Sequence, residues 1–249
     1  MKLSFLTSCM DRLHHLDLTY LKNMKKSMPM GPSKIDVEFV LLNYNSKDKI
    51  DDWVSANKKE FEKNAEFRYI KTTKPKFFDM SVVKNILGKN ATGTHLCWLD
   101  ADNLTENGFV DFVYSNFKLH PNCILNVPYS DDTKGFGGRI VCSKHHFLKV
   151  NGYDESFVGW GYEEIDFVNR LCKTGCKKIS IPKKYLGKLE HSEDERVSNY
   201  DPRFVSKINP THKNSHMKYK SNLSNFMRST ANIKKNKLVA NENIPWGVL

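Results

Sequence analysis

Long apolar runs are missing from this sequence of 249 residues. No stretch reaches the roughly 18 apolar residues that a membrane-spanning helix needs, so we expect no such helix. The opening segment, residues 1–10, resembles a signal peptide only superficially, because its apolar run is short and Asp11 and Arg12 follow it at once. We therefore interpret this segment as the first strand of the fold.

Cysteine is too scattered to indicate a disulfide framework. The six cysteines lie at positions 9, 97, 123, 142, 172 and 176, and several fall inside strand-like runs. Cys172 and Cys176 form one pair on a predicted helix, but no second pair lies nearby, so the spacing does not indicate a zinc site. Reduced, partly buried thiols are typical of cytosolic proteins, and we expect a cytoplasmic location.

Acidic residues are absent between Arg203 and Asn241, a stretch that contains nine basic residues. The whole chain has a net charge of +11, from 39 Lys and Arg against 28 Asp and Glu. Such an arm favours anionic partners, namely membrane lipid, a phosphorylated substrate or nucleic acid. A solvated basic surface without a partner is the alternative. The apolar end of the arm, Ile244-Pro245-Trp246, could instead fold back over an active site.

Apolar residues alternate between strand-like runs and helical spacing in the first half of the chain. This strand–helix alternation occurs three times and leads into a fourth strand, which predicts a parallel sheet with helices on both faces, an α/β fold. The second half is less regular. We predict strands at 2–9, 37–43, 67–71 and 95–99, and helices at 13–28, 50–61 and 79–88.

Two acids follow the fourth predicted strand. Residues 95–99 are mostly apolar and run straight into Asp100 and Asp102. The chain usually turns where a strand ends, so both carboxylates can reach one ligand. Oxygen donors suit a hard divalent cation, and open α/β sheets bind their ligands at this edge. A loop whose Asp residues only cap the next helix is equally compatible with the spacing.

A second constellation has Gly159 and Gly161 on either side of Trp160, followed by Glu163 and Glu164. The glycines let the backbone bend sharply and present the indole outward. Glu163 begins a predicted helix, where the helix dipole favours ionised carboxylates. An exposed ring beside carboxylates suits a sugar, whose C–H groups stack on the ring while its hydroxyls donate to the acids. A helix start with ordinary capping acids and a buried Trp is the alternative.

Three single residues could also bind a metal or a nucleotide. His191 ends a predicted strand, and imidazole is compatible with Mn²⁺, so it could complete a metal site with Asp102. Arg12 follows the first strand and Lys84 lies in the helix before the acidic turn, so each could face the phosphates or base of a nucleotide. For each residue taken alone, a solvated surface group is the alternative.

In this order, the features resemble the GT-A glycosyltransferases, in particular the galactosyltransferase and chondroitin-polymerase group of inverting enzymes that use nucleotide sugars. The resemblance covers roughly residues 3–205. It implies an α/β fold with a GT-A (Rossmann-like) nucleotide-binding sheet. Residues 1–210 would form a single catalytic domain, with a nucleotide-binding half (1–103) and an acceptor-binding half (104–210). Residues 211–249 would form a basic tail. The segments that carry it are 4–12, 42–46, 84–85, 99–103, 137–138, 151–166 and 190–192.

The resemblance also implies roles for single residues. The chain departs from the family at Glu164, where the family usually has Asp, so the carboxylate reaches one methylene further, and at Asn43, where the family often has Asp. The implied roles are nucleotide binding by Thr7, Arg12, Asn45, Lys84 and Asp100; metal ligation by Asp102 and His191; sugar binding by Trp160, Gly161, Glu163 and Gly138; and general-base catalysis by Glu164.

The resemblance implies a metal-dependent inverting enzyme with Mn²⁺ or Mg²⁺ as cofactor. It would move a hexose or N-acetylhexosamine from a UDP-sugar to a hydroxyl of a glycan or lipid-linked saccharide, and we expect no nucleic-acid partner. Peripheral contact of the basic tail with an anionic membrane face is a further expectation. The alternatives are a nucleotidyltransferase that makes a nucleotide sugar and a non-catalytic module that binds sugar or nucleic acid.

Overall fold

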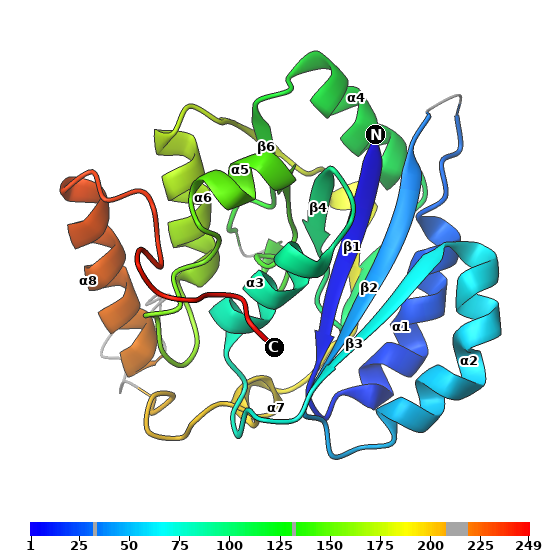
Figure 1. Ribbon diagram of the computed structural model, residues 1–249, viewed down its shortest axis with the longest axis horizontal. Coiled ribbons are helices and arrows are strands. Elements are labelled where there is room, and N and C mark those ends of the chain that lie inside the picture. The colour runs from blue at the N-terminus through cyan, green and yellow to red at the C-terminus, as the bar shows by residue number, and fades with distance from the viewer. Residues whose placement is uncertain (32–33, 131–132, 208–218) are drawn as a thin grey trace.

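A seven-stranded sheet forms the centre of the protein (Figure 1). The structure is a computed structural model that describes residues 1–31, 34–130, 133–207 and 219–249. The predicted boundary between residues 210 and 211 lies outside the described residues. In spatial order the strands are β3 (Glu66–Thr72), β2 (Asp36–Tyr44), β1 (Lys2–Cys9), β4 (His95–Trp98), β7 (Ile140–Ser143), β6 (Cys123–Asn126) and β8 (Lys177–Ser180).

The sheet is mixed, whereas the sequence pattern predicts a parallel one. The four strands from the first half run parallel to one another, and β6 and β8 are also parallel. β7, however, runs antiparallel to both β4 and β6. β6 and β7 follow one another in the chain and pair directly, which antiparallel strands can do without a crossover helix.

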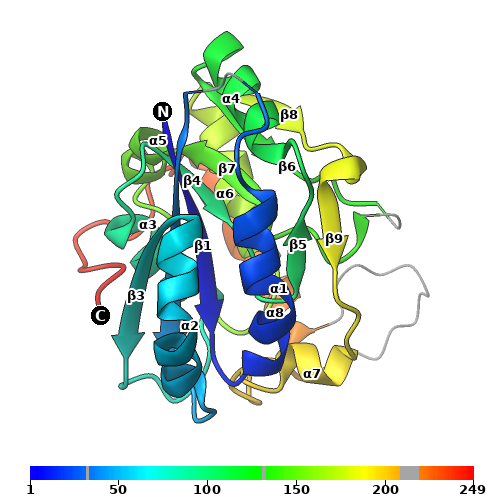
Figure 2. The same ribbon diagram turned by 90° about the vertical axis from the view of Figure 1, so that its right-hand side faces the viewer.

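Helices cover both faces of this sheet, as predicted. α1 (Leu13–Lys26), α2 (Ile50–Asn64) and α4 (Phe109–Leu119) supply side chains to one buried hydrophobic cluster. α3 (Met80–Asn90), α5 (Lys144–Lys149) and α6 (Glu163–Lys173) supply a second cluster on the other face. Figure 2 shows α1 and α2 side by side on the first face.

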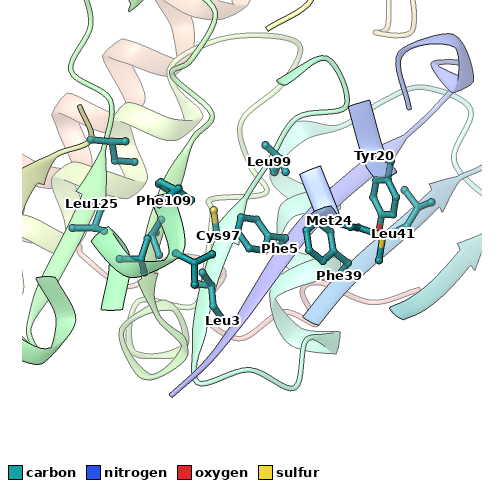
Figure 3. Close-up of a cluster of buried hydrophobic side chains, with 14 of the residues drawn as sticks. Leu3, Phe5, Tyr20, Met24, Phe39, Leu41, Cys97, Leu99, Phe109 and Leu125 are labelled. Carbon is teal, nitrogen blue, oxygen red and sulfur yellow. The ribbon is translucent and has the colours of Figure 1, made fainter. Parts of the chain in front are cut away.

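The pleat of the central strands separates the two clusters. Phe5 of β1 belongs to the first cluster and its neighbour Leu6 to the second, because successive side chains of a strand point to opposite faces. In the first cluster Phe5 stacks on Phe39 of β2 at a centroid distance of 4.8 Å, and Tyr20 of α1 meets Phe39 edge-on (Figure 3). The apolar alternation that predicts the strands thus builds the core.

A separate two-stranded sheet connects the two halves of the chain. β5 (Asn103–Thr105) directly follows the acidic turn and pairs antiparallel with β9 (Leu186–Lys188), which a 3-10 turn at Lys183–Tyr185 precedes. The backbone N–H of Leu189 then donates to the carbonyl of Asp102 at 2.7 Å. This pairing directs the following segment, with His191 and the short helix α7 (Glu193–Val197), toward the acidic turn.

The C-terminal part of the chain packs on the domain. α8 (Lys220–Lys234) contacts α6, and the chain then returns across α3 (Figure 1). The Trp246 ring lies 5.7 Å from that of Phe147, and the carbonyl of Trp246 accepts from Lys89. The apolar end therefore folds back, but onto α3 and α5. The division of the chain at residues 103 and 210 stays a prediction.

Among the described residues, no helix combines the length and apolar character that crossing a bilayer requires.

A buried ion pair fastens α6 to the loop before it. The Arg170 guanidinium donates to Asp166 at 2.7 Å and to the carbonyls of Val150 and Gly152 at 3.1 and 2.8 Å. The side chains of Arg170 and Asp166 are 3% and 2% exposed. A buried charge needs such complete pairing, because its desolvation is expensive.

We expect Asp166→Ala to lower the free energy of unfolding by about 3–5 kcal/mol, because it leaves a buried guanidinium without its counter-charge. The matched control is Glu62→Ala, which removes another i,i+4 pair, Lys58–Glu62, whose side chains are 60% and 51% exposed. That control should cost no more than about 0.5 kcal/mol. Urea unfolding of both variants measures the difference, and equal losses would contradict the assignment.

Candidate active site

A cavity of about 140 Å³ opens at the carboxyl ends of β1 and β4. Open α/β sheets bind their ligands at this edge, because the loops after parallel strands meet there. The lining joins residues from the first half with a later segment: Ser8, Met10, Arg12, His15, Phe78, Met80, Asp100, Ala101, Asp102, Gly135, Trp160, His191, Arg196, Asn199 and Tyr200.

The acidic turn forms the floor of the cavity. The N–H of Leu99 donates to the carbonyl of Leu6 at 2.9 Å, which continues the pairing with β1 up to Asp100. A Cβ at Gly138 would lie 2.3 Å from Oδ2 of Asp100, so a larger residue here would displace the Asp100 carboxylate. Burial raises the pKa of Asp100, and the nearby Lys84 ammonium opposes that rise.

Asp102 and His191 meet at the edge of the cavity. Nε2 of His191 lies 3.0 Å from Oδ2 of Asp102, and the two side chains are 11% and 17% exposed. The hydrogen bond to Asp102 raises the pKa of His191. Burial by itself would raise the pKa of Asp102, but the hydrogen bond and charge of His191, together with hydrogen bonds from the backbone and from Asn103, lower the pKa overall. The pair therefore favours a charged carboxylate facing an imidazole.

This donor set fits a divalent cation. A carboxylate oxygen and an imidazole nitrogen at 3.0 Å are spaced as neighbouring ligands of one ion would be, and both line the cavity. Carboxylate and imidazole together are compatible with Mn²⁺, whereas Mg²⁺ prefers oxygen donors alone. The two residues leave the remaining coordination positions to water or to the oxygens of a ligand.

Trp160 also lines the cavity. Gly159 and Gly161 adopt φ values of +64° and +106°, the left-handed region that favours glycine. The backbone N–H and carbonyl of Trp160 both bond to the Ser221 hydroxyl, at 3.2 and 2.9 Å, and Tyr219 meets the indole edge-on at 5.5 Å. The indole is half-buried and lines the cavity, so it is not a core tryptophan.

Two glutamates with opposite ionisation follow this loop. Burial raises the pKa of Glu163 well above its usual range. Burial by itself would raise the pKa of Glu164, but this carboxylate accepts from the Lys84 ammonium at 2.7 Å, and that cation together with hydrogen bonds from the backbone and from Glu163 lowers the pKa overall. Burial would likewise lower the pKa of Lys84, but the charges of Glu164 and Asp100 raise it. Environments that separate two pKa values in this way are typical of acid–base sites.

The structure brings most of the predicted site residues together, but not all. Arg12 lines the cavity, and its guanidinium pairs with Glu195. Thr7 does not line it, because its side chain is completely buried on the other face of β1, and Ser8 takes the place in the cavity. Asn45 also lies outside, where its amide donates to the carbonyl of Pro75 at 2.7 Å.

Five of the predicted site residues lie behind the cavity wall: Lys84, Glu163, Glu164, Gly138 and Gly161. Lys84 reaches Glu164, and Gly138 backs Asp100. The carbonyl of Gly161 accepts from Asn225 at 2.9 Å. Tyr200, which lines the cavity, feels the charges of Glu163, Glu164 and Asp100, so this group adjoins the same site. The individual roles of all these residues stay predictions.

The segment after His191 supplies residues that the sequence analysis missed. Arg196, Asn199 and Tyr200 line the cavity, and the amide of Asn199 donates to the carbonyl of Met10 at 2.5 Å. No sequence pattern marks them. The adjacent histidines His14 and His15 are the feature of the sequence that could have pointed to this segment. Both imidazoles contact Glu195 of α7, at 2.9 and 3.3 Å, and they fasten the segment to α1.

Arg139 is a further missed residue. It is 1% exposed, lies close enough to Asp100 and Asp102 to feel their charges, and donates to the carbonyl of Leu104 at 3.3 Å. Among the described residues, its Nε and Nη1 have no acceptor. Its buried positive charge lies beneath the acidic turn and compensates part of the negative charge there.

Part of the chain matches a family of known proteins. A family model described as "N-terminal domain of galactosyltransferase" matches residues 120–195, a segment that contains Trp160, both glutamates and His191. Beta-1,4-galactosyltransferase 1 from Bos taurus is 38% identical over 83 residues, which cover 32% of this chain and 20% of that protein. Beta-1,4-galactosyltransferase 2 from Cricetulus griseus is 38% identical over 79 residues, 30% of this chain and 21% of that protein.

Solved glycosyltransferases share the fold over a longer stretch. S. aureus TarS 1-349 superposes with a TM-score of 0.59 at 11% identity, over 75% of this chain and 60% of that one. The mannosyltransferase PcManGT from Pyrobaculum calidifontis, in complex with GDP-Man and Mn²⁺, gives 0.56 at 13% identity, over 74% and 55%. The predicted GT-A fold and the predicted resemblance to galactosyltransferase-like glycosyltransferases are confirmed. The chain spans about a fifth of the length of the curated relatives.

We expect Lys84→Met to lower the free energy of unfolding by about 3 kcal/mol near neutral pH, because it leaves Glu164 buried without a cation. Without Lys84, the pKa of Glu164 in the folded state rises above its unfolded value. The folded variant then binds more protons than the unfolded chain, and its stability relative to the original protein falls as the pH rises.

Urea unfolding at about pH 5.5 and about pH 7.5 measures this difference. The matched control is Lys71→Met, which breaks an exposed pair with Asp51 whose side chains are 48% and 47% exposed. It should cost no more than about 1 kcal/mol. A pH-independent loss in Lys84→Met would show that Lys84 does not hold Glu164 ionised.

Proposed function

We propose that this chain is a metal-dependent inverting glycosyltransferase. It would move a hexose or N-acetylhexosamine from a UDP-sugar to a hydroxyl of a glycan or lipid-linked saccharide. The observation that carries the proposal is one cavity that joins the acidic turn and His191 to Trp160, with Glu163 and Glu164 directly behind. Sugar transfer by the matched galactosyltransferases supports the reaction class, and the structures of TarS in complex with UDP and with UDP-GlcNAc support the donor.

The donor would lie along the carboxyl ends of β1 and β4. Arg12 and the acidic turn line that part of the cavity, so the diphosphate would meet both a guanidinium and the metal ligands Asp102 and His191. A bound Mn²⁺ supplies Lewis-acid stabilisation of the charge that develops on the departing diphosphate. Asp102 and His191 would hold that ion, and Asp100 would bind near the ribose or the waters of the metal.

The acceptor would stack on Trp160. Glu163, held protonated by burial, would hydrogen-bond sugar hydroxyls, and Glu164, held ionised by Lys84, would take the proton of the attacking hydroxyl. The acceptor oxygen forms a bond to the anomeric carbon while the bond from that carbon to the diphosphate breaks. Attack from the face opposite the leaving group inverts the anomeric centre, as in an inverting hydrolase.

The alternatives differ in their products. A nucleotidyltransferase would release pyrophosphate, and a binding module would release nothing. Neither needs an indole and a carboxylate–imidazole pair in the lining of one cavity, and Trp160, Asp102 and His191 all line this one. A fixed aromatic ring beside a metal site suits a sugar held next to a nucleotide diphosphate.

We expect the protein to release UDP from at least one UDP-hexose in the presence of Mn²⁺, slowly without an acceptor and faster with one. Excess chelator should abolish this release. His191→Ala and Asp102→Asn should each weaken Mn²⁺ binding by at least about tenfold, because each removes one of two protein ligands. A screen of UDP- and GDP-sugars identifies the donor. Release that persists in chelator would contradict the metal role.

We expect Glu164→Gln to lower turnover by about 10²-fold or more while donor binding changes little, because the amide cannot accept the hydroxyl proton. The matched control is Glu62→Gln on α2, whose carboxylate is exposed at the surface and which should leave turnover unchanged. Single-turnover kinetics at saturating donor measure the effect. Full activity of Glu164→Gln would assign the base to another group.

A further inference from the structure

α8 buries mainly small and polar residues, while its apolar residues Phe226 and Ile233 are only half-buried. Its buried residues are Ser221, Asn222, Asn225 and Ser229, all small or polar. The amide of Asn225 donates to the carbonyls of Val158 and Gly161 at 3.1 and 2.9 Å. Hydrogen bonds to the loop around Trp160 therefore hold the inner face of α8, where a surface helix usually buries an apolar stripe.

The outer face of α8 carries two large exposed apolar side chains. Leu223 and Met227 are four residues apart, so they lie on one side of the helix, and they are 40% and 62% exposed. Ala231 continues the same row and is also exposed. An exposed apolar row on a helix that its own domain holds by polar contacts indicates a partner for that row.

Cations surround this apolar row. Lys220 and Lys234 extend it at either end, Arg228 and Lys235 flank it, and all four are exposed. Residues 220–234 include no Asp or Glu. Apolar side chains in the middle of a helix face with Lys and Arg around them are the pattern of a helix that lies in the interface of an anionic membrane. A nucleic-acid surface would use the cations and leave Leu223 and Met227 in water.

We propose that the outer face of α8 docks on an anionic lipid bilayer. Leu223 and Met227 would enter the boundary between headgroups and acyl chains, while the surrounding Lys and Arg side chains contact lipid phosphates. Figure 1 shows α8 at the outer edge of the molecule beside α6.

This docking would orient the candidate active site. The hydroxyl of Ser221, in the first turn of α8, bonds to both backbone groups of Trp160, and Tyr219 packs on the indole. The membrane surface would therefore lie beside the wall of the cavity that we assign to the acceptor. This part of the inference rests on the proposed function and identifies the acceptor class as a lipid-linked saccharide.

Sedimentation of the full chain with vesicles tests the docking. We expect binding to phosphatidylcholine vesicles that contain phosphatidylglycerol to be at least about tenfold tighter than to pure phosphatidylcholine, since each cation near such a surface contributes roughly fivefold. Leu223→Ser/Met227→Ser should weaken that binding at least about fivefold. The matched control is Leu119→Ser on α4, where the side chain is 73% exposed, and it should bind unchanged.

A charge variant separates lipid from other polyanions. Lys220→Gln/Arg228→Gln/Lys234→Gln should also lose binding, whereas Lys58→Gln/Lys59→Gln/Lys63→Gln on α2 should not. Binding that depends on the cations of α8 but not on Leu223 and Met227 would overturn the proposal and indicate a polyanion site. Equal binding to both kinds of vesicle would also overturn it. Circular dichroism of each variant confirms that it is folded.

Turnover separates this inference from the proposed function. Leu223→Ser/Met227→Ser should keep its UDP release with a soluble saccharide acceptor and lose it with the same saccharide on a lipid in anionic vesicles. An equal loss with both acceptors would overturn the orienting role of α8. A protein that binds anionic vesicles but releases no UDP with any donor would refute the transferase and leave the docking intact.

Discussion

The contact between Asp102 and His191 holds the two halves of the candidate site together. These residues are 89 positions apart, and the short β5–β9 sheet brings their backbones side by side. The hydrogen bond from the N–H of Leu189 to the carbonyl of Asp102 continues the β5–β9 pairing. The backbone before His191 is therefore fixed beside the acidic turn, which leaves the His191 imidazole little freedom to move away. Together with the contacts of Glu195 to α1 and of Asn199 to the carbonyl of Met10, this contact fastens the segment that closes the cavity to the sheet.

Burial of charge is the second constraint on the site. Four carboxyl groups, those of Asp100, Asp102, Glu163 and Glu164, gather where water has little access. Lys84 and Arg139 supply positive charge beneath them. In a partly desolvated site this balance sets the pKa of each acid, which is lowered at Glu164 and raised well above its usual range at Glu163. The four carboxyl groups outnumber these two cations, so the charge balance favours a bound metal cation, which the proposed chemistry needs.

The sequence predicted the fold well, because the fold depends on local apolar periodicity. The strands of the first half and their intervening helices lie within a few residues of their predicted positions. The prediction failed where strand direction depends on a pairing between distant segments, as at β7. Thr7, which is predicted to bind nucleotide, lies outside the candidate cavity, since successive side chains of a strand point to opposite faces and its neighbour Ser8 is the one that lines it.

The chemical types in the site were determined by the sequence alone: an acidic turn after a buried strand, an indole between glycines, two glutamates at a helix start and a late histidine. Their spacing along the chain also limited where each could lie on an α/β sheet. Only the tertiary structure decided which of them share a cavity, which glutamate is ionised, and that Arg196, Asn199 and Tyr200 complete the wall. The physical reason is that pairing, burial and charge balance depend on distances between segments that lie far apart in the chain.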